Sequence, residues 1–312
     1  MERKLKEIDE ENREKYSDDN EKMKKVDDHL SFIVEKQDVY CKMERTLKEK
    51  EEDDEEEEEI FYSPERMEEK IQENEEIQSN DHDEKKKIDQ LRERVAKQDP
   101  DSKEVDDLTL RRFLRARDLD IEKASAMFMK YSTWRRMFVP TGSIPASDVA
   151  NQAAQNKMFM QGVDKRGCPV AVIHGAKHFP SKGSNDELKR FAVFVLDKIC
   201  SRIPCGQEKF TIIVDLKGYG YSNSDVRGYI AALSILQDYY PERLKKLFFV
   251  HVPYIFMTAW KIIYPFVDKN TRKKITFVEN KKLHDALLEE IDLNQLPEIY
   301  GGKLQLVPIQ DA

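Results

Sequence analysis

Apolar residues recur at two different spacings in the second part of the chain. Almost continuous apolar runs, typical of strands buried on both faces, lie at 158–162, 169–174, 210–215, 247–252 and 275–278. Residues 185–200 and 222–239 repeat apolar side chains every three to four positions, which predicts amphipathic helices. Asp164–Gly167 is typical of a hairpin turn between the first two strands, and Ser222 with Asp225 predicts a capping box for the second helix. This alternation predicts an α/β fold whose mostly parallel or mixed sheet is flanked by helices and joined by right-handed crossovers.

A helical unit is predicted ahead of the sheet. Residues 108–114 and 122–138 have apolar side chains at helical spacing, and Asp106 or Asp107 is available as an N-cap for the first of them. Leu91 and Val95 share one face of a further helix, which Pro100 separates from the next. We therefore divide the chain into an appendage at 1–84, a helical unit at 85–140 and an α/β domain at 141–312.

Charge divides the chain in the same way. Residues 1–100 carry 21 Lys and Arg against 36 Asp and Glu, a net charge of −15, whereas the rest carries +7. The appendage has little apolar surface to offset its chain entropy. A rough heptad from Met23 to Leu47 allows a short coiled coil, but a solvated helix or disorder is favoured. The acidic run Glu51–Glu59 is interpreted as a disordered spacer, with an electrostatic brake on membrane docking as the alternative.

Several classes of protein have no support in this sequence. The four cysteines form no CxxC pair and join no histidine cluster, so we expect a reducing compartment and no metal. The N-terminal residues have no apolar signal core, and no run of 18 apolar residues occurs, so membrane contact is expected to be peripheral. Nucleotide-binding glycine loops, a nucleophile elbow and a recognisable Ser/His/Asp spacing are all absent. We predict neither catalysis nor a cofactor.

Two polar motifs leave alternatives open. The arginines at 111, 112, 115 and 117 alternate with apolar residues and lack exposed aromatic partners, which favours internal pairing, with one arginine facing a ligand, over nucleic-acid binding. Asp215 ends a strand and is followed by Lys217 and Gly218. It is interpreted as pairing locally, with a ligand-facing carboxylate as the alternative.

The stretch from Tyr240 to Lys274 combines apolar segments with fixed cations. An apolar strand is followed by Tyr254–Phe266, whose only charge is Lys261, and then by the basic cluster Arg272–Lys274. This pattern favours an amphiphilic ligand with its tail in the protein and an anionic head at the rim. Tyr254–Phe266 is interpreted either as a core helix or as a movable gate whose aromatic residues meet the pocket or a bilayer.

Five ordered motifs give the chain a family resemblance. They are LRRFLRARDLDIEKA, IIVDLKGYG, YYPERLKKLFFVHVP, PFVDKNTRKKI and LPEIYGG. Residues 88–304 resemble a CRAL-TRIO lipid-binding domain with its N-terminal helical unit, of the phosphatidylinositol/phosphatidylcholine transfer protein type. The resemblance implies a sheet floor, a hydrophobic pocket for one lipid and a gate helix that opens at a membrane.

The resemblance also implies site residues. Head-group contacts fall on Arg117, Glu242, Arg243, Thr271 and Lys274, and the gate and pocket on Tyr254, Phe256, Trp260, Ile263, Tyr264, Phe266, Phe210 and Ile212. The sequence departs from the family pattern in two places. Asp118 stands where phosphatidylinositol-binding relatives have a basic residue, and Phe210 and Ile212 replace hydroxyl side chains of choline-lipid binders. The second departure disfavours phosphatidylcholine more than phosphatidylinositol.

The expected function is therefore lipid transfer or presentation. We expect a cytoplasmic, monomeric, non-enzymatic protein that contacts membranes peripherally, binds one phospholipid (phosphatidylinositol first), binds no nucleic acid and meets a protein partner through residues 1–84. The alternative is a binding module for another hydrophobe, such as a sterol, tocopherol or retinoid, with the acidic appendage recruiting the partner.

Overall fold

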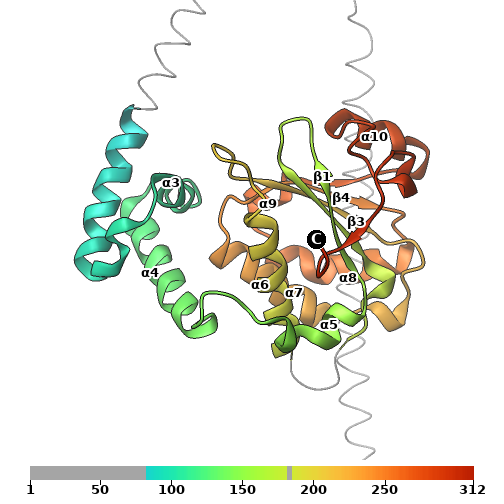
Figure 1. The fold of residues 1–312 in the computed structure, drawn as a ribbon, viewed down its shortest axis with the longest axis horizontal. Coiled ribbons are helices and arrows are strands. Elements are labelled where there is room, and N and C mark those ends of the chain that lie inside the picture. The colour runs from blue at the N-terminus through green and yellow to red at the C-terminus, as the bar shows by residue number, and fades with distance from the viewer. Residues whose placement is uncertain (1–81, 181–184) are drawn as a thin grey trace, which may run out of the picture. The chain divides into compact units, whose positions relative to one another are not determined.

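The computed structural model of the chain describes residues 82–180 and 185–312 (Figure 1). The helical unit predicted at 85–140 and most of the α/β domain predicted at 141–312 lie within these two ranges. The predicted heptad from Met23 and the acidic run Glu51–Glu59 lie outside the described residues.

Six strands form one mixed sheet within the described ranges, in the order β5-β4-β3-β2-β1-β6. Strands β2 to β5 are parallel, and β1 is antiparallel to both β2 and β6. The antiparallel β1–β2 pair and the parallel β2–β3–β4–β5 order confirm the predicted hairpin and the mixed α/β sheet. The two-residue β6 was not predicted because so short a strand has no readable periodicity. The strands are β1 (Met158–Val163), β2 (Pro169–His174), β3 (Phe210–Asp215), β4 (Leu244–Val250), β5 (Ile275–Phe277) and β6 (Val307–Pro308).

Helices cover the two faces of the sheet unequally (Figure 1). Alternate strand residues, such as Ile212 and Ile213, point into different apolar clusters because successive side chains leave a strand on opposite faces. One face packs against α6 (Asp186–Cys200), α7 (Val226–Tyr239) and α8 (Tyr254–Ile263), and the other against α10 (Leu283–Glu290). The chain also forms two short helices, α5 (Ala150–Ala154) before β1 and α9 (Lys269–Arg272) before β5.

The predicted helical unit consists of a helix at 82–98, α3 (Asp107–Arg115) and α4 (Ile121–Phe138). The Asp106 carboxylate caps α3 by accepting a hydrogen bond from the backbone N–H of Thr109 at 2.8 Å. Leu91 and Val95 are fully buried against α3 and α4, as their shared face predicted.

The helical unit is joined to the α/β domain by packing at the end of α4. Trp134 stacks on Tyr239, the last residue of α7, with ring centroids 3.8 Å apart. The Arg135 guanidinium adds a hydrogen bond of 2.8 Å to the Asp197 carboxylate of α6. These contacts fix α4 against the two helices that lie over the sheet.

Two predicted helix boundaries are wrong, and each error has a local cause. Helix α7 begins at Val226 rather than Ser222, because Asp225 itself is the N-cap and accepts from the Gly228 N–H at 2.9 Å. The segment Tyr254–Phe266 is not one helix: α8 ends at Ile263 and a single 3₁₀ turn follows. Pro265 explains this break, since proline lacks an N–H and disfavours helix in the residue before it.

Candidate functional site

An apolar cavity of about 290 Å³ lies between the sheet and the helices α6, α7 and α8. The sheet contributes Ile212 and Val214 from β3, and α8 contributes Phe256, Trp260 and Ile263. Further lining residues, almost all apolar, include Phe191, Val195, Leu196, Ala232, Leu233, Leu236, Leu247 and Phe249. The wall is therefore suited to hydrocarbon and provides few hydrogen-bonding groups.

The predicted gate and pocket residues of α8 and of the 3₁₀ turn after it divide between the cavity and the surface. Phe256, Trp260 and Ile263 line the cavity, whereas Tyr254, with 87% of its surface exposed, Tyr264 and Phe266 face solvent. Among the two predicted strand residues, Ile212 lines the cavity. Phe210 does not: it is fully buried in the core beside the cavity.

Four of the five predicted head-group residues lie where two neighbouring strands begin. Glu242 and Arg243 precede β4, and Thr271 and Lys274 precede β5, which is parallel to β4. The Lys274 ammonium lies 3.1 Å from the Glu242 carboxylate. Thr271 lines the cavity. Cation, carboxylate and hydroxyl therefore lie at the amino edge of the sheet, next to the apolar wall.

Local backbone geometry positions this group. Asp268 caps α9 by accepting from the Thr271 N–H at 2.8 Å, and it also accepts from the Thr271 hydroxyl. The Lys274 carbonyl accepts from the Leu247 N–H at 2.8 Å, which fixes Lys274 against β4. Glu242 has φ of +55°, a left-handed conformation that non-glycine residues rarely adopt. The chain thus bends at Glu242, in the turn before β4, and the Glu242 carboxylate reaches Lys274 at the start of β5.

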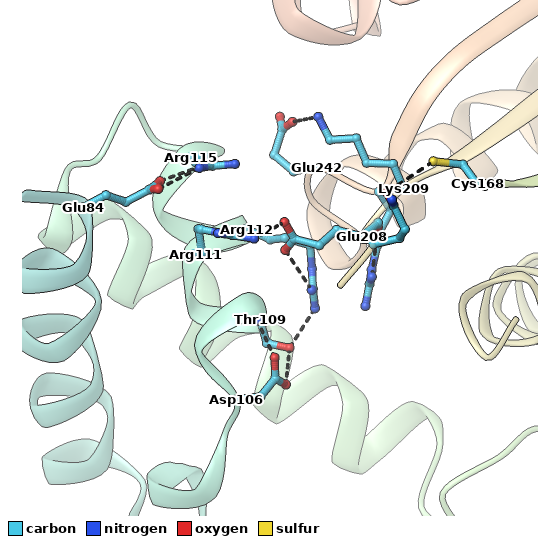
Figure 2. A network of polar contacts seen from close by, with 12 residues as sticks. Glu84, Asp106, Thr109, Arg111, Arg112, Arg115, Cys168, Glu208, Lys209 and Glu242 are labelled. Carbon is cyan, nitrogen blue, oxygen red and sulfur yellow. Dashed lines mark hydrogen bonds and ion pairs between the residues drawn. The ribbon is translucent and has the colours of Figure 1, made fainter. Parts of the chain in front are cut away.

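A second network forms around Glu208, and Figure 2 shows two arginines of α3 that take part in it. Glu208 accepts from Arg111 at 2.7 Å and from Arg112 at 3.4 Å, both on α3. Arg243 donates to the Glu208 carbonyl at 2.9 Å. Burial and the neighbouring Arg243 cation lower the pKa of Arg112 from its ordinary value. Internal pairing of the α3 arginines, as the sequence favoured, is confirmed.

The structure does not bring Arg117 into either network. Its guanidinium donates to the carbonyl of Ala116, its own neighbour, at 2.7 Å. Asp118 and Leu119 follow with φ of +53° and +61°, so the chain turns sharply directly after Arg117. A head-group role for Arg117 stays a prediction.

Comparisons with known proteins agree with this architecture. The family models for the CRAL/TRIO domain and the CRAL/TRIO N-terminal domain match residues 153–302 and 87–130. The chain is 34% identical over 217 residues to the Sec14 cytosolic factor of Schizosaccharomyces pombe. The alignment covers 64% of this chain and 76% of that relative. The chain belongs to the CRAL/TRIO family. This confirms the family, and the observed sheet and helices confirm the fold class that the five motifs indicated.

Two further similarities accompany that match. The phosphatidylinositol transfer protein CSR1 of Eremothecium gossypii is 29% identical over 63% of this chain and 47% of its own length. The crystal structure of Sfh5 aligns with a TM-score of 0.53 at 22% sequence identity, covering 65% of this chain and 83% of that one. The Sfh5 likeness supports the CRAL/TRIO fold alone.

The CRAL/TRIO cavity has a buried polar group at its other end, which sequence reasoning missed. The Lys157 ammonium lies 2.9 Å from Nδ1 of His178, whose Nε2 lies 3.2 Å from the Asp225 carboxylate. Gln152 and Gln155 also accept from Lys157. Lys157 and His178 line the cavity, but their polar atoms are already bonded to one another and to these partners. The group thus forms part of the cavity wall at the carboxyl edge of the sheet, with its buried polar atoms satisfied by internal hydrogen bonds.

Stability should depend on the protonation of His178. Burial and the Lys157 cation lower its pKa from 6.5 to about 4. Between those two values the unfolded chain binds a proton that the folded chain does not, so stability falls as the pH drops. From pH 7 to pH 5 we expect the wild type to lose about 2 kcal/mol more than His178→Gln. Urea denaturation of both proteins at the two pH values measures this, and parallel losses would contradict it.

Asp215 is a structural residue on the opposite face of the CRAL/TRIO sheet. Its carboxylate accepts from the Lys217 N–H at 2.8 Å and the Tyr300 hydroxyl at 3.1 Å, and lies 2.9 Å from Nδ1 of His251. Gly218 follows with φ of +78°. The predicted local contact with Lys217 is present, but it involves the Lys217 backbone and not its ammonium, and the other two partners, His251 and Tyr300, are distant in sequence.

Proposed function

We propose that this CRAL/TRIO domain binds one phospholipid, phosphatidylinositol in the first place, and exchanges it at membranes. The observation that carries the proposal is the continuity between the apolar cavity and a polar rim. Thr271 belongs to the cavity wall, and the Glu242–Lys274 pair follows it at the amino edge of the sheet. A lysine and a hydroxyl suit a phosphodiester, and the carboxylate suits inositol hydroxyls.

The energetics favour a closed carrier. Each methylene removed from water contributes about 0.8 kcal/mol, so two acyl chains amount to roughly 20 kcal/mol or more. A lipid in the cavity keeps its acyl chains out of water while the protein crosses the aqueous phase. It leaves the protein at a membrane, where the bilayer shields the acyl chains instead. The name of the relative CSR1 states phosphatidylinositol transfer for that protein, which supports the same ligand here.

The gate in this proposal is α8 with the turn that follows it. Its inner face covers the cavity, while Tyr254, Ile262, Tyr264 and Phe266 are exposed and suited to a membrane interface. Gln237 of α7 connects the end of the gate to the body: it donates to the Phe266 carbonyl at 3.1 Å and accepts from the Asp268 N–H at 2.8 Å. Opening would break these two hydrogen bonds and exchange them for lipid contacts.

The proposed setting is the cytoplasm, with peripheral membrane contact and no catalysis. Among the described helices, none is both long and apolar enough to span a bilayer. We propose a monomer that binds no nucleic acid. A protein partner at residues 1–84 remains part of the proposal.

The double variant Lys274→Ala with Thr271→Ala should abolish phosphatidylinositol transfer between vesicles, because it removes a cation and a hydroxyl from the rim. Lys281→Ala is the matched control, since Lys281 is an exposed lysine next to α10. Circular dichroism and thermal unfolding check that both variants fold. Undiminished transfer by the folded double variant would overturn the site.

A second candidate function is binding of a more compact hydrophobe, such as a sterol, tocopherol or retinoid. Its specific support is the cavity volume of about 290 Å³, which lies at the small end of ligand pockets. Mass spectrometry of the lipid that co-purifies with the protein separates the candidates: a phospholipid favours the first and a compact hydrophobe the second.

A further inference from the structure

Two lysines converge on one carboxylate at the rim of the cavity. Lys209 lies 3.7 Å and Lys274 lies 3.1 Å from the same Oε2 atom of Glu242. Lys209 is the residue before β3, so β3, β4 and β5 each contribute one member where they begin (Figure 2 shows Lys209 and Glu242). Neither the motifs nor the apolar pattern identified Lys209.

This group carries one uncompensated positive charge. Glu242 can neutralise only one of the two ammonium groups. The adjacent carboxylate, Glu208, is engaged by Arg111 and Arg112, and within the described ranges Glu242 is the one carboxylate within 4.0 Å of Lys209. The side chain of Lys209 is 40% exposed and that of Lys274 is 20% exposed, so an anion can approach both.

We infer that Lys209 is a further head-group residue and that this rim selects lipids whose head group has a net charge of −1. One phosphodiester with an uncharged remainder, such as inositol or glycerol, balances the two lysines and Glu242. A zwitterionic head group brings its own ammonium next to two lysines, where like charges repel. The inference rests on the proposed function and deepens it by naming the ligand class.

The expected loss of lipid transfer in Lys209→Met depends on how exposed the Lys209 side chain is. A charge-assisted hydrogen bond to phosphate is stronger than a neutral one, but exposed charges are screened by solvent and salt. We expect Lys209→Met to reduce transfer of phosphatidylinositol and of phosphatidylglycerol by roughly three- to tenfold, while phosphatidylcholine transfer is unchanged. Lys209→Arg restores the charge and should restore at least half of the loss.

The experiment uses the full chain and phosphatidylcholine vesicles that contain one labelled lipid each: phosphatidylinositol, phosphatidylglycerol or phosphatidylcholine. Lys281→Met is the matched control, because it removes one exposed lysine and keeps the aliphatic stem. Equal losses for all three lipids would indicate a structural role for Lys209 and would overturn the inference. Loss for the inositol lipid alone would overturn the charge-based class.

A second measurement separates the head group from the membrane surface. Sedimentation with the same vesicles should give equal membrane binding for wild type and Lys209→Met, since labelled lipid is too dilute to change surface charge. A transfer loss matched by weaker sedimentation would overturn the inference. If Lys209→Met has no effect while the Lys274→Ala, Thr271→Ala variant loses transfer, this inference fails alone; if neither loses transfer, the proposed function fails with it.

Discussion

Gly302→Ala is expected to destabilise the protein by about 3–5 kcal/mol, a loss at the upper end for a single substitution. A Cβ at this position would lie 2.0 Å from the carbonyl oxygen of Leu296 and 2.4 Å from its carbonyl carbon. Both atoms belong to the backbone, so no side-chain rotation relieves the overlap. The segment must move instead, which breaks the hydrogen bonds of 2.9 and 3.0 Å that the Leu296 carbonyl accepts from Lys303 and Leu304.

The loss would reach the sheet because Leu296 is fully buried with Leu287 and Ile291 in the core under α10. Urea denaturation of Gly302→Ala measures the change. Gly220→Ala is the control, since the nearest atom to its Cβ would be 3.9 Å away and its φ of −139° suits any residue. We expect the control to stay within about 1 kcal/mol of wild type. A Gly302→Ala protein as stable as the control would contradict the overlap.

The elements that could be predicted are those whose signal is local. Buried parallel strands such as Phe210–Asp215 have continuous apolar runs, and helices such as Asp186–Cys200 have a clear period, so both were placed within a residue. The break at Pro265 was also readable, because the effect of proline on a helix is local. The apolar composition of Tyr254–Phe266 obscured it.

The parts of the site that could not be predicted depend on contacts between distant segments. Lys157, His178 and Asp225 come from three separate segments, and no spacing in the sequence connects them. Lys209 meets Glu242 only because β3 and β4 begin at the same edge of the sheet. Strand alternation places Phe210 and Ile212 on one face, but the packing of helices over that face decides which of them meets the cavity.

Ala232→Trp should abolish the transfer of every lipid while the fold remains. Ala232 lines the cavity from α7, where an indole ring would occupy space now available to hydrocarbon. We expect at least a tenfold loss of both phosphatidylinositol and phosphatidylcholine transfer, because few methylenes can then be buried and each contributes about 0.8 kcal/mol. The milder substitution Ala192→Phe narrows the same cavity from α6. It is a second test of the prediction if the larger indole ring of Ala232→Trp overpacks the core and unfolds the protein.

Ser234→Trp adds the same ring on the exposed side of α7 and should transfer lipid normally. Vesicle transfer and mass spectrometry of co-purifying lipid measure the effect, and thermal unfolding checks the fold. A folded Ala232→Trp protein that still carries lipid would exclude the cavity as the hydrocarbon site. Cavity variants should thus reduce the transfer of every lipid whatever its head group, whereas Lys209→Met should reduce only the transfer of lipids with an anionic head group. Loss of that difference would mean that the amino-edge residues support the cavity and do not recognise the ligand.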